Sequence, residues 1–385
     1  MNSRINMTPI PLSLYIHIPW CVRKCPYCDF NSHEARNNIP EERYVDALLR
    51  DLESELPNIW GRPLTSIFIG GGTPSLFSAR AIDKLINGLR QRLPLRPNME
   101  ITMEANPGTF EQERFNAFRE SGINRLSIGI QSFDNNKLTA LGRIHNGKEA
   151  LKAASIAKKA GFDNFNLDLM YGLPNQSNAE ALSDLQQAIE NKPSHISWYQ
   201  LTIEENTLFH HSPPVLPNDE ALWDMSSTGI QLLESSDYQQ YEVSAFAKKN
   251  RRCQHNINYW QFGDYLGIGA GAHGKLTMPN KEITRHSKYK HPEKYIETAL
   301  NGDARSSEQL LTKDDLNFEF ILNMSRLKRG FNQELYETRT LLPFSSISHQ
   351  LQEVIDDGLM EIKEGYYVTT TKGWMFINNI VERFL

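Results

Sequence analysis

A repeated alternation of strand-like and helix-like segments constrains the fold of this chain most strongly. Six runs of strand-favouring residues occur in the first 202 positions, and segments with apolar residues spaced three and four apart lie between them. Such alternation is typical of a parallel sheet with helices packed outside it. We therefore predict an α/β fold built as a partial (β/α)6 barrel of the TIM type. The predicted strands are residues 12–18, 64–70, 99–104, 125–130, 165–170 and 196–202.

Polar and glycine-rich features follow these predicted strands at the same end. A cysteine cluster follows the first strand, and a Gly-Gly-Gly-Thr-Pro segment at residues 70–74 follows the second. Glu104 ends the third strand, Gln131 follows the fourth, and Asp168 lies near the end of the fifth. Because α/β barrels carry their chemistry at the carboxyl edge of the strands, we expect these residues to meet in one site.

Three of the four cysteines, Cys21, Cys25 and Cys28, are crowded near the N-terminus. Close thiols in a reducing compartment indicate a metal or cluster site rather than disulfides. Three thiolates would leave one iron of a four-iron cluster open, and that iron could chelate the amino and carboxylate groups of a methionine moiety. The alternative is a zinc site with His17 or His33 as the fourth ligand. The absence of a second C-x2-C pair from the sequence favours the cluster.

Charge and hydropathy argue against nucleic-acid binding and against a membrane-spanning segment. The net charge is −5 and the pI is about 6.2, so we expect no binding to nucleic acid through an overall positive field. No run of eighteen apolar residues occurs, so we expect no transmembrane segment. The first dozen residues do not resemble a secretion signal, which predicts a cytoplasmic protein.

The sequence pattern changes twice after the predicted barrel, which suggests three parts. Residues 1–240 would form the barrel domain, residues 241–307 a linking region rich in glycine and aromatic residues, and residues 308–385 a separate α+β domain. Within the last part, a helix at 348–357 and a hairpin at 360–368 predict a winged-helix-like domain. Its eight Lys and Arg against twelve Asp and Glu disfavour DNA binding, so we interpret it as a lid or docking module.

The spacing C-x3-C-x2-C, with Tyr27 before the last cysteine, is similar to the signature of the radical S-adenosylmethionine (SAM) superfamily. The segment Tyr-Ile-His-Ile-Pro-Trp-Cys at 15–21 resembles its coproporphyrinogen-dehydrogenase branch. The resemblance implies a radical-SAM barrel with a [4Fe–4S] cluster on Cys21, Cys25 and Cys28. It also implies a SAM site in which Gly71, Gly72 and Thr73 take the methionine amino group, and in which the other ligand-binding residues are Tyr15, Tyr27, Glu104, Gln131, Arg143 and Asp168.

Two departures separate this chain from the decarboxylases of that branch. Phe30 stands where those enzymes carry a further cysteine, and only about a dozen residues precede the first strand. Both departures resemble instead the haem-chaperone group of the oxygen-independent coproporphyrinogen III oxidase-like family. The His-Asn-x-x-Tyr-Trp motif of that group is present at 255–260.

The resemblance implies a haem site on this motif. His255 could ligate the iron, while Tyr259 and Trp260 could pack on the porphyrin. Cys253 could also ligate or attach haem, and the basic run just upstream, Lys248, Lys249, Arg251 and Arg252, could meet the propionates. The alternative is a structural turn in which His255 and the two aromatic residues belong to the core and the basic run is solvated.

The primary hypothesis is therefore a haem chaperone that receives haem and delivers it to apo-haemoproteins. It would use a [4Fe–4S] cluster, SAM and an electron donor for the cluster, and it could touch membranes only peripherally, through acceptor proteins. The alternative is a radical SAM enzyme acting on a tetrapyrrole, either an oxidative decarboxylase or a methyltransferase. Loss of the decarboxylase cysteine argues against a coproporphyrinogen III dehydrogenase, and whether the chain is an enzyme stays open. A transcriptional regulator is disfavoured by the acidic C-terminal part.

Overall fold

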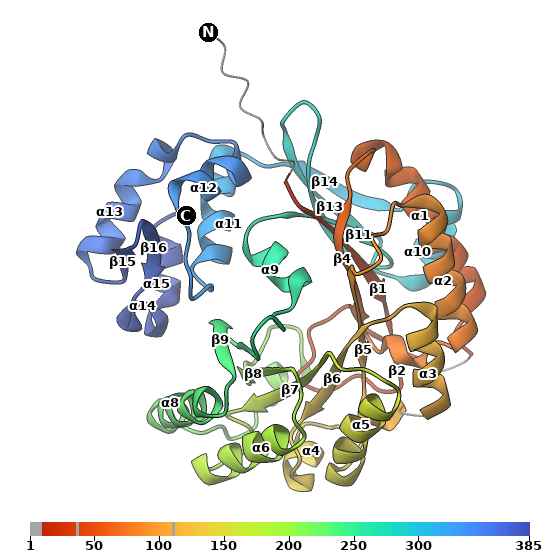
Figure 1. The fold of residues 1–385 in the computed structure, drawn as a ribbon, viewed down its shortest axis with the longest axis horizontal. Coiled ribbons are helices and arrows are strands. Elements are labelled where there is room, and N and C mark those ends of the chain that lie inside the picture. Colours follow the sequence, from red (N-terminus) through yellow and green to blue (C-terminus); the bar gives the residue numbers. More distant parts are fainter. Residues whose placement is uncertain (1–9, 36–37, 110–111) are drawn as a thin grey trace.

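One twelve-stranded sheet runs through most of the chain in the computed structural model, which describes residues 10–35, 38–109 and 112–385 (Figure 1). Seven neighbouring strands are parallel, and the sheet is extended at both ends by antiparallel strands. The strand order is β14-β13-β12-β11-β1-β4-β5-β6-β7-β8-β10-β9.

Six of the parallel strands agree with the predicted barrel strands to within two residues. They are buried almost throughout, as expected for parallel strands covered on both faces. The prediction of an α/β partial barrel of the (β/α)6 type is therefore confirmed. The six strands are β1 (Leu12–Ile18), β4 (Leu64–Gly71), β5 (Glu100–Ala105), β6 (Arg125–Gln131), β7 (Phe165–Tyr171) and β8 (His195–Gln200).

Helices cover the outer face of these strands (Figure 1). The apolar side chains spaced three and four apart pack inward, since Tyr44, Leu48 and Leu52 of the first helix are fully buried. Asn146 and Ser177 form capping boxes that begin two of the helices. The outer helices are α1 (Glu41–Ile59), α2 (Ala79–Arg92), α3 (Gln112–Ser121), α4 (Asn135–Ala140), α5 (Gly147–Lys159), α6 (Asn178–Glu190) and α8 (Asp219–Ser235).

The segment predicted to link the two domains supplies much of the sheet. It contains strand β11 (Asp264–Ile268), which pairs in parallel with β1. Helix α9 (Gln254–Trp260) packs against β1, β4 and β11, in the opening that the curved sheet surrounds in Figure 1. The other strands beyond the parallel set are β9 (Gln239–Glu242), β10 (Ala245–Ala247), β12 (His273–Thr277), β13 (Ile283–Lys288) and β14 (Arg305–Leu310).

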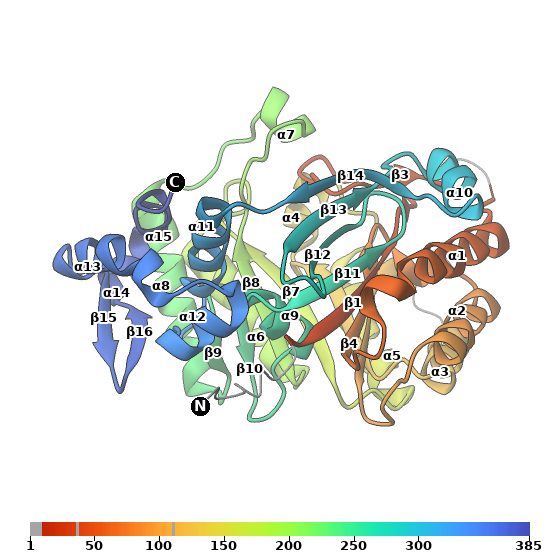
Figure 2. The ribbon, with the colours of Figure 1, turned by 90° about the horizontal axis from the view of Figure 1, so that it is seen from above.

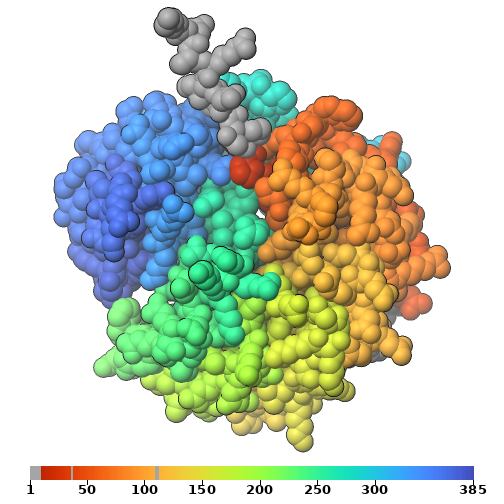
Figure 3. Space-filling view, in the orientation of Figure 1, coloured from red at the N-terminus to blue at the C-terminus, as the bar shows by residue number. Residues whose placement is uncertain are grey.

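A C-terminal domain with its own apolar core lies beside the β9 edge of the sheet, remote from α1 and from α10 (Pro292–Leu300) (Figure 2). The space-filling view shows it packed on the segment around α8 and β9 (Figure 3), where Val243 N donates to Arg326 O over 3.0 Å. The predicted helix and hairpin are present. The domain comprises α11 (Lys313–Met324), α12 (Gln333–Thr340), α13 (Ser348–Asp356), β15 (Met360–Lys363), β16 (Tyr366–Thr369), α14 (Thr371–Met375) and α15 (Ile377–Glu382). The boundaries proposed at residues 240 and 308 stay predictions.

A buried ion cluster ties α1 to the added strands. Lys288 Nζ donates to Asp51 Oδ1 and Glu55 Oε1, each over 2.7 Å, and all three side chains are almost fully buried. Arg305 Nη2 donates to Glu55 Oε2 over 2.6 Å, and Tyr295 OH donates to Asp51 Oδ2 over 2.8 Å. Because a buried charge without a partner is costly, this cluster penalises any arrangement that separates α1 from β13.

Replacing Lys288 with Met should lower the free energy of unfolding by about 3 to 5 kcal/mol, because Asp51 would remain buried without its cation. The measurement is urea denaturation followed by circular dichroism. Lys294→Met is the matched control, since Lys294 pairs with Glu297 at the surface, and its cost should stay below about 1 kcal/mol. Equal losses in the two variants would contradict a structural role for the cluster.

Candidate active site and adjoining cavity

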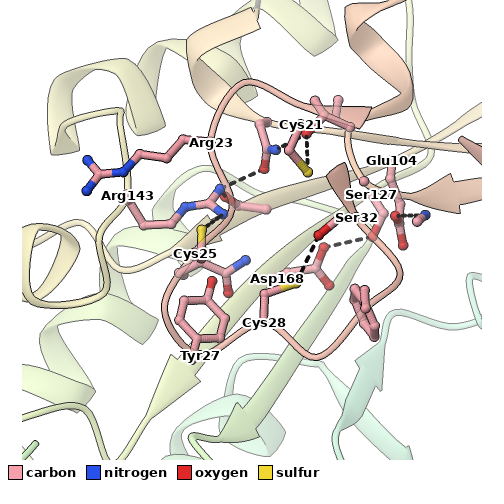
Figure 4. A pocket seen from close by; sticks show the side chains of 18 of the residues that line it. Cys21, Arg23, Cys25, Tyr27, Cys28, Ser32, Glu104, Ser127, Arg143 and Asp168 are labelled. Carbon is pink, nitrogen blue, oxygen red and sulfur yellow. Dashed lines mark hydrogen bonds between the residues drawn. The ribbon is translucent and has the colours of Figure 1, made fainter. Parts of the chain in front are cut away.

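A cavity of about 300 Å³ lies at the carboxyl edge of the parallel strands, where the sequence predicted a site (Figure 4). Eleven of the twelve residues assigned to the cluster and to SAM line it. The exception is Tyr15, which faces an adjoining cavity. The eleven are Cys21, Cys25, Tyr27, Cys28, Gly71, Gly72, Thr73, Glu104, Gln131, Arg143 and Asp168. Their roles as ligands stay predictions, but the fold brings them together.

The three cysteine sulfurs reach this cavity from the end of β2 (Trp20–Cys21) and from the loop that joins it to β3 (His33–Glu34). Each sulfur has a polar neighbour of its own. Thr73 Oγ1 lies 3.6 Å from Cys21 Sγ, Arg143 Nη1 lies 3.6 Å from Cys25 Sγ, and Ser32 Oγ lies 3.9 Å from Cys28 Sγ. Hydrogen bonds to sulfur stabilise thiolate and set the potential of iron–sulfur clusters, so the donor set fits a three-cysteine cluster.

The zinc alternative fits less well, because both proposed fourth ligands are engaged elsewhere. His17 Nδ1 bonds Tyr15 OH over 2.9 Å and His17 Nε2 bonds Asn31 O over 2.8 Å. His33 Nε2 lies 3.3 Å from Asn31 Oδ1. Neither histidine lines the cysteine cavity.

The glycine-rich loop after β4 requires glycine because it runs against the end of β1. Gly71 has φ of 111°, and a Cβ there would collide with the His17 ring. A Cβ on Gly72 would lie 2.5 Å from Trp20 O. The loop's amide N–H groups are already bonded, Gly71 N to Glu104 Oε2 over 2.9 Å and Thr73 N to Trp20 O over 2.7 Å. These amides are therefore not free to bind an anion. A ligand ammonium, which donates hydrogen bonds, would instead meet carbonyl or carboxylate oxygens here.

Arg143 connects the cysteine loop to the sheet. Its Nη2 donates to Asn106 Oδ1 over 2.6 Å and to Gly129 O over 2.8 Å, while Nη1 reaches Cys25. Asn106 in turn donates to Thr73 Oγ1 over 2.8 Å. This chain of contacts holds the loops after β4, β5 and β6 in register around the cavity.

Two carboxyl groups share the polar wall of the cavity (Figure 4). Asp168 accepts from Ser127 Oγ over 2.9 Å and from Asn166 Nδ2 over 2.7 Å. Burial raises the pKa of Asp168. Burial, and then the nearby Asp168, raise the pKa of Glu104 to about 8, so Glu104 is mostly protonated at neutral pH. A cationic ligand beside Glu104 would favour its ionised form.

A second cavity of about 790 Å³ adjoins the first. Phe30, Ser32, Gly71 and Glu104 line both cavities and so form a shared wall. The predicted haem residues His255, Tyr259 and Trp260 all line the second cavity. Its volume lies in the range of small-molecule and cofactor sites.

Helix α9 presents His255 to this cavity. Ser66 Oγ lies 3.2 Å from His255 Nδ1, and no other described residue forms a hydrogen bond to the ring, so Nε2 is left for a ligand. The ring packs against Phe68, with centroids 5.1 Å apart, and against Tyr15 at 6.4 Å. Burial, and then Arg125, lower the pKa of His255 to about 3, so the imidazole is neutral, as a metal ligand must be.

The structure departs from the sequence interpretation in the segment before α9. None of Lys248, Lys249, Arg251 and Arg252 is among the described residues that line the second cavity. Cys253 does not line it either. It is fully buried, its Sγ lies 3.6 Å from Glu100 Oε1, and burial raises the pKa of its thiol to about 12. The chain enters α9 from the amino end of the strands, and periodicity in the sequence could not show this.

Several lining residues were missed by the sequence analysis. Asn106 stands in the same Glu-Ala-Asn-Pro segment as Glu104, which was a usable signal. Ser127 and Tyr199 had none, since their position within buried strands gives no functional pattern. Among the described residues, the lysines that line the second cavity are Lys24 and Lys290, which lie far apart in the sequence.

The fold is similar to a solved radical SAM enzyme. The structure described as "Coproporphyrinogen III oxidase (HemN) from Escherichia coli is a Radical SAM enzyme" superposes with a TM-score of 0.81 at 25% identity, covering 98% of this chain and 90% of that one. Residues 15–188 match the family model of the Radical SAM superfamily, and residues 311–376 match that of the HemN C-terminal domain. No described helix has the length and apolar character needed to span a bilayer.

Curated relatives match nearly the whole chain. "Heme chaperone HemW" of Haemophilus influenzae is 52% identical over 379 residues, with 97% of this chain and 98% of that protein covered. The proteins of the same name from Escherichia coli and Bacillus subtilis are 52% and 30% identical, each covering 97% of this chain and 98% and 99% of their own length. The resemblance seen in the sequence is confirmed. The chain belongs to the radical SAM superfamily and, within it, to the family of the HemW proteins.

Proposed function

We propose that this protein is a haem chaperone that binds haem in the second cavity and passes it to apo-haemoproteins. The observation that carries the proposal is the position of His255, whose Nε2 is left for a ligand in a cavity lined by Tyr259 and Trp260. Imidazole is a common axial ligand of haem iron, and aromatic faces suit a flat apolar macrocycle. The names of the relatives support this reading.

Cys21, Cys25 and Cys28 would hold a [4Fe–4S] cluster, with SAM in the polar part of the first cavity. Asp168 would accept from the ribose hydroxyls, and Glu104 with the glycine loop would receive the methionine ammonium. When bound, the cluster supplies electrons that can break the sulfonium C–S bond of SAM. We propose that the protein works in the cytoplasm with an electron donor, and that it reaches membranes only through its acceptors.

The wall that the two cavities share favours an alternative function, that of an enzyme. A tetrapyrrole in the second cavity would be separated from SAM only by Phe30, Ser32, Gly71 and Glu104. A decarboxylase would release carbon dioxide from coproporphyrinogen III when SAM and a reductant are supplied to the reconstituted protein. Absence of product under those conditions, with haem binding intact, would favour the chaperone.

His255→Ala should weaken haem binding at least about tenfold, because the iron would lose a ligand. The contribution of that ligand to the binding free energy is comparable to that of one strong polar contact. The measurement is the Soret shift during haem titration of the reconstituted protein. His210→Ala is the matched control, since His210 is exposed on α7 (Leu208–His211) and lines neither cavity. Unchanged affinity in His255→Ala would contradict the haem site.

The triple variant Cys21→Ala/Cys25→Ala/Cys28→Ala should lose bound iron and acid-labile sulfide after anaerobic reconstitution, because no cluster ligand would remain. Cys253→Ala should retain both, since this thiol is buried away from the cavity. Iron retained by the triple variant would place the cluster elsewhere, and a zinc content matching one ion per chain in wild type would revive the zinc site.

A further inference from the structure

The second cavity is amphipathic. Its inner part is lined by aromatic side chains, among them Tyr15, Tyr259, Trp260 and Tyr265, all of which are half-buried or buried. Two exposed lysines, Lys24 and Lys290, lie at the cavity as well. An apolar interior with cations in its exposed part suits a ligand that is flat and apolar at one end and anionic at the other.

Both lysines border the loop at residues 29–33. Lys24 Nζ donates to Phe30 O over 3.1 Å from one side of this loop. Lys290 lies beside Asn31, whose Nδ2 donates both to Lys290 O and to Ala270 O over 2.9 Å. Asn31 thus joins three segments far apart in the chain into one rim, and both lysines of this rim line the cavity.

Neither lysine is neutralised by a carboxylate of the residues that the structure describes. Among the described residues, no ion pair involves the ammonium group of Lys24 or of Lys290, whereas Lys275 and Lys288 are each paired within the core. The carboxyl groups among the described residues that line the cavity are those of Asp29 and Glu104. Glu104 also lines the first cavity, where the methionine ammonium of SAM would pair with its carboxyl and offset its charge.

We propose that Lys24 and Lys290 bind the two propionate carboxylates of the haem and so set its orientation, with the propionate edge at the rim and the opposite edge against Tyr259 and Trp260. This inference rests on the proposed haem site. A lysine ammonium is a flexible point charge, so each carboxylate gains an electrostatic contact while its other oxygen stays hydrated. The cations predicted for this role from the sequence, Lys248 to Arg252, do not line the cavity.

The test compares haem with haem dimethyl ester, in which both carboxylates are uncharged. Wild type, Lys24→Gln/Lys290→Gln and the control Lys249→Gln/Arg251→Gln are reconstituted anaerobically, and Kd is measured for each ligand by Soret titration at low and at high salt. The control removes the same charge from exposed residues away from the cavity. Iron and sulfide content checks that Lys24→Gln, next to Cys25, leaves the cluster in place.

We expect wild type and the control to bind haem about fivefold more tightly than the ester, since two exposed charge pairs contribute about 1 kcal/mol together. In Lys24→Gln/Lys290→Gln the preference should fall to about twofold or less, with the ester affinity unchanged and the salt dependence reduced. Lys290→Gln alone, far from the cysteines in sequence, should remove part of the preference.

A double variant that still prefers haem over the ester would overturn the assignment of the lysines. Equal affinity of wild type for the two ligands would overturn it too, while leaving haem binding itself intact. Loss of the preference in Lys249→Gln/Arg251→Gln instead would move the propionates to the basic run. Failure of wild type to bind either ligand would overturn the proposed function, and the inference with it.

Discussion

The parallel pairing of β1 with β11 is the contact on which both cavities depend. It joins residues about 250 positions apart, Leu12 with Asp264 and Ile16 with Ile268. Strand β1 leads into the cysteine loop, and strand β11 follows α9, which carries His255. Pairing of β1 with β4 on its other edge adds the glycine loop. The long loop closure is costly in entropy, and the buried Lys288 cluster and the packing of α1 and α10 help to offset it.

The loop after β4 lies close to the end of β1, and this contact determines the shape of the wall between the cavities. Glycine at 71 and 72 lets the loop after β4 lie against His17 and Trp20, which any Cβ would prevent. The same approach brings the Gly71 amide to Glu104, so a carboxyl from β5 becomes part of the wall. Because this carboxyl is desolvated, it is mostly neutral until a cation arrives. The same carboxyl therefore lines both cavities.

Strand positions and the residues at strand ends were accessible from the sequence, because period and turn chemistry are local properties. Eleven of the residues assigned to the first site line one cavity, and the helix and hairpin of the C-terminal domain lie where they were expected. The segment 241–307 was harder to interpret. Its strands are short and mostly antiparallel additions to the sheet, and no local pattern distinguishes such strands from a glycine-rich connection.

The sequence by itself determined the class of barrel, the thiolates available to a cluster and the motif that contains His255. Only the tertiary structure decided which charges face the second cavity. Lys248 to Arg252 adjoin the motif in the chain but do not line the cavity, whereas Lys24 and Lys290 line it together. Residues that are close in the sequence can lie far apart in space when a strand crossover comes between them. Here the pairing of β1 with β11 and the Asn31 hydrogen bonds bring residues that are distant in the sequence to one rim.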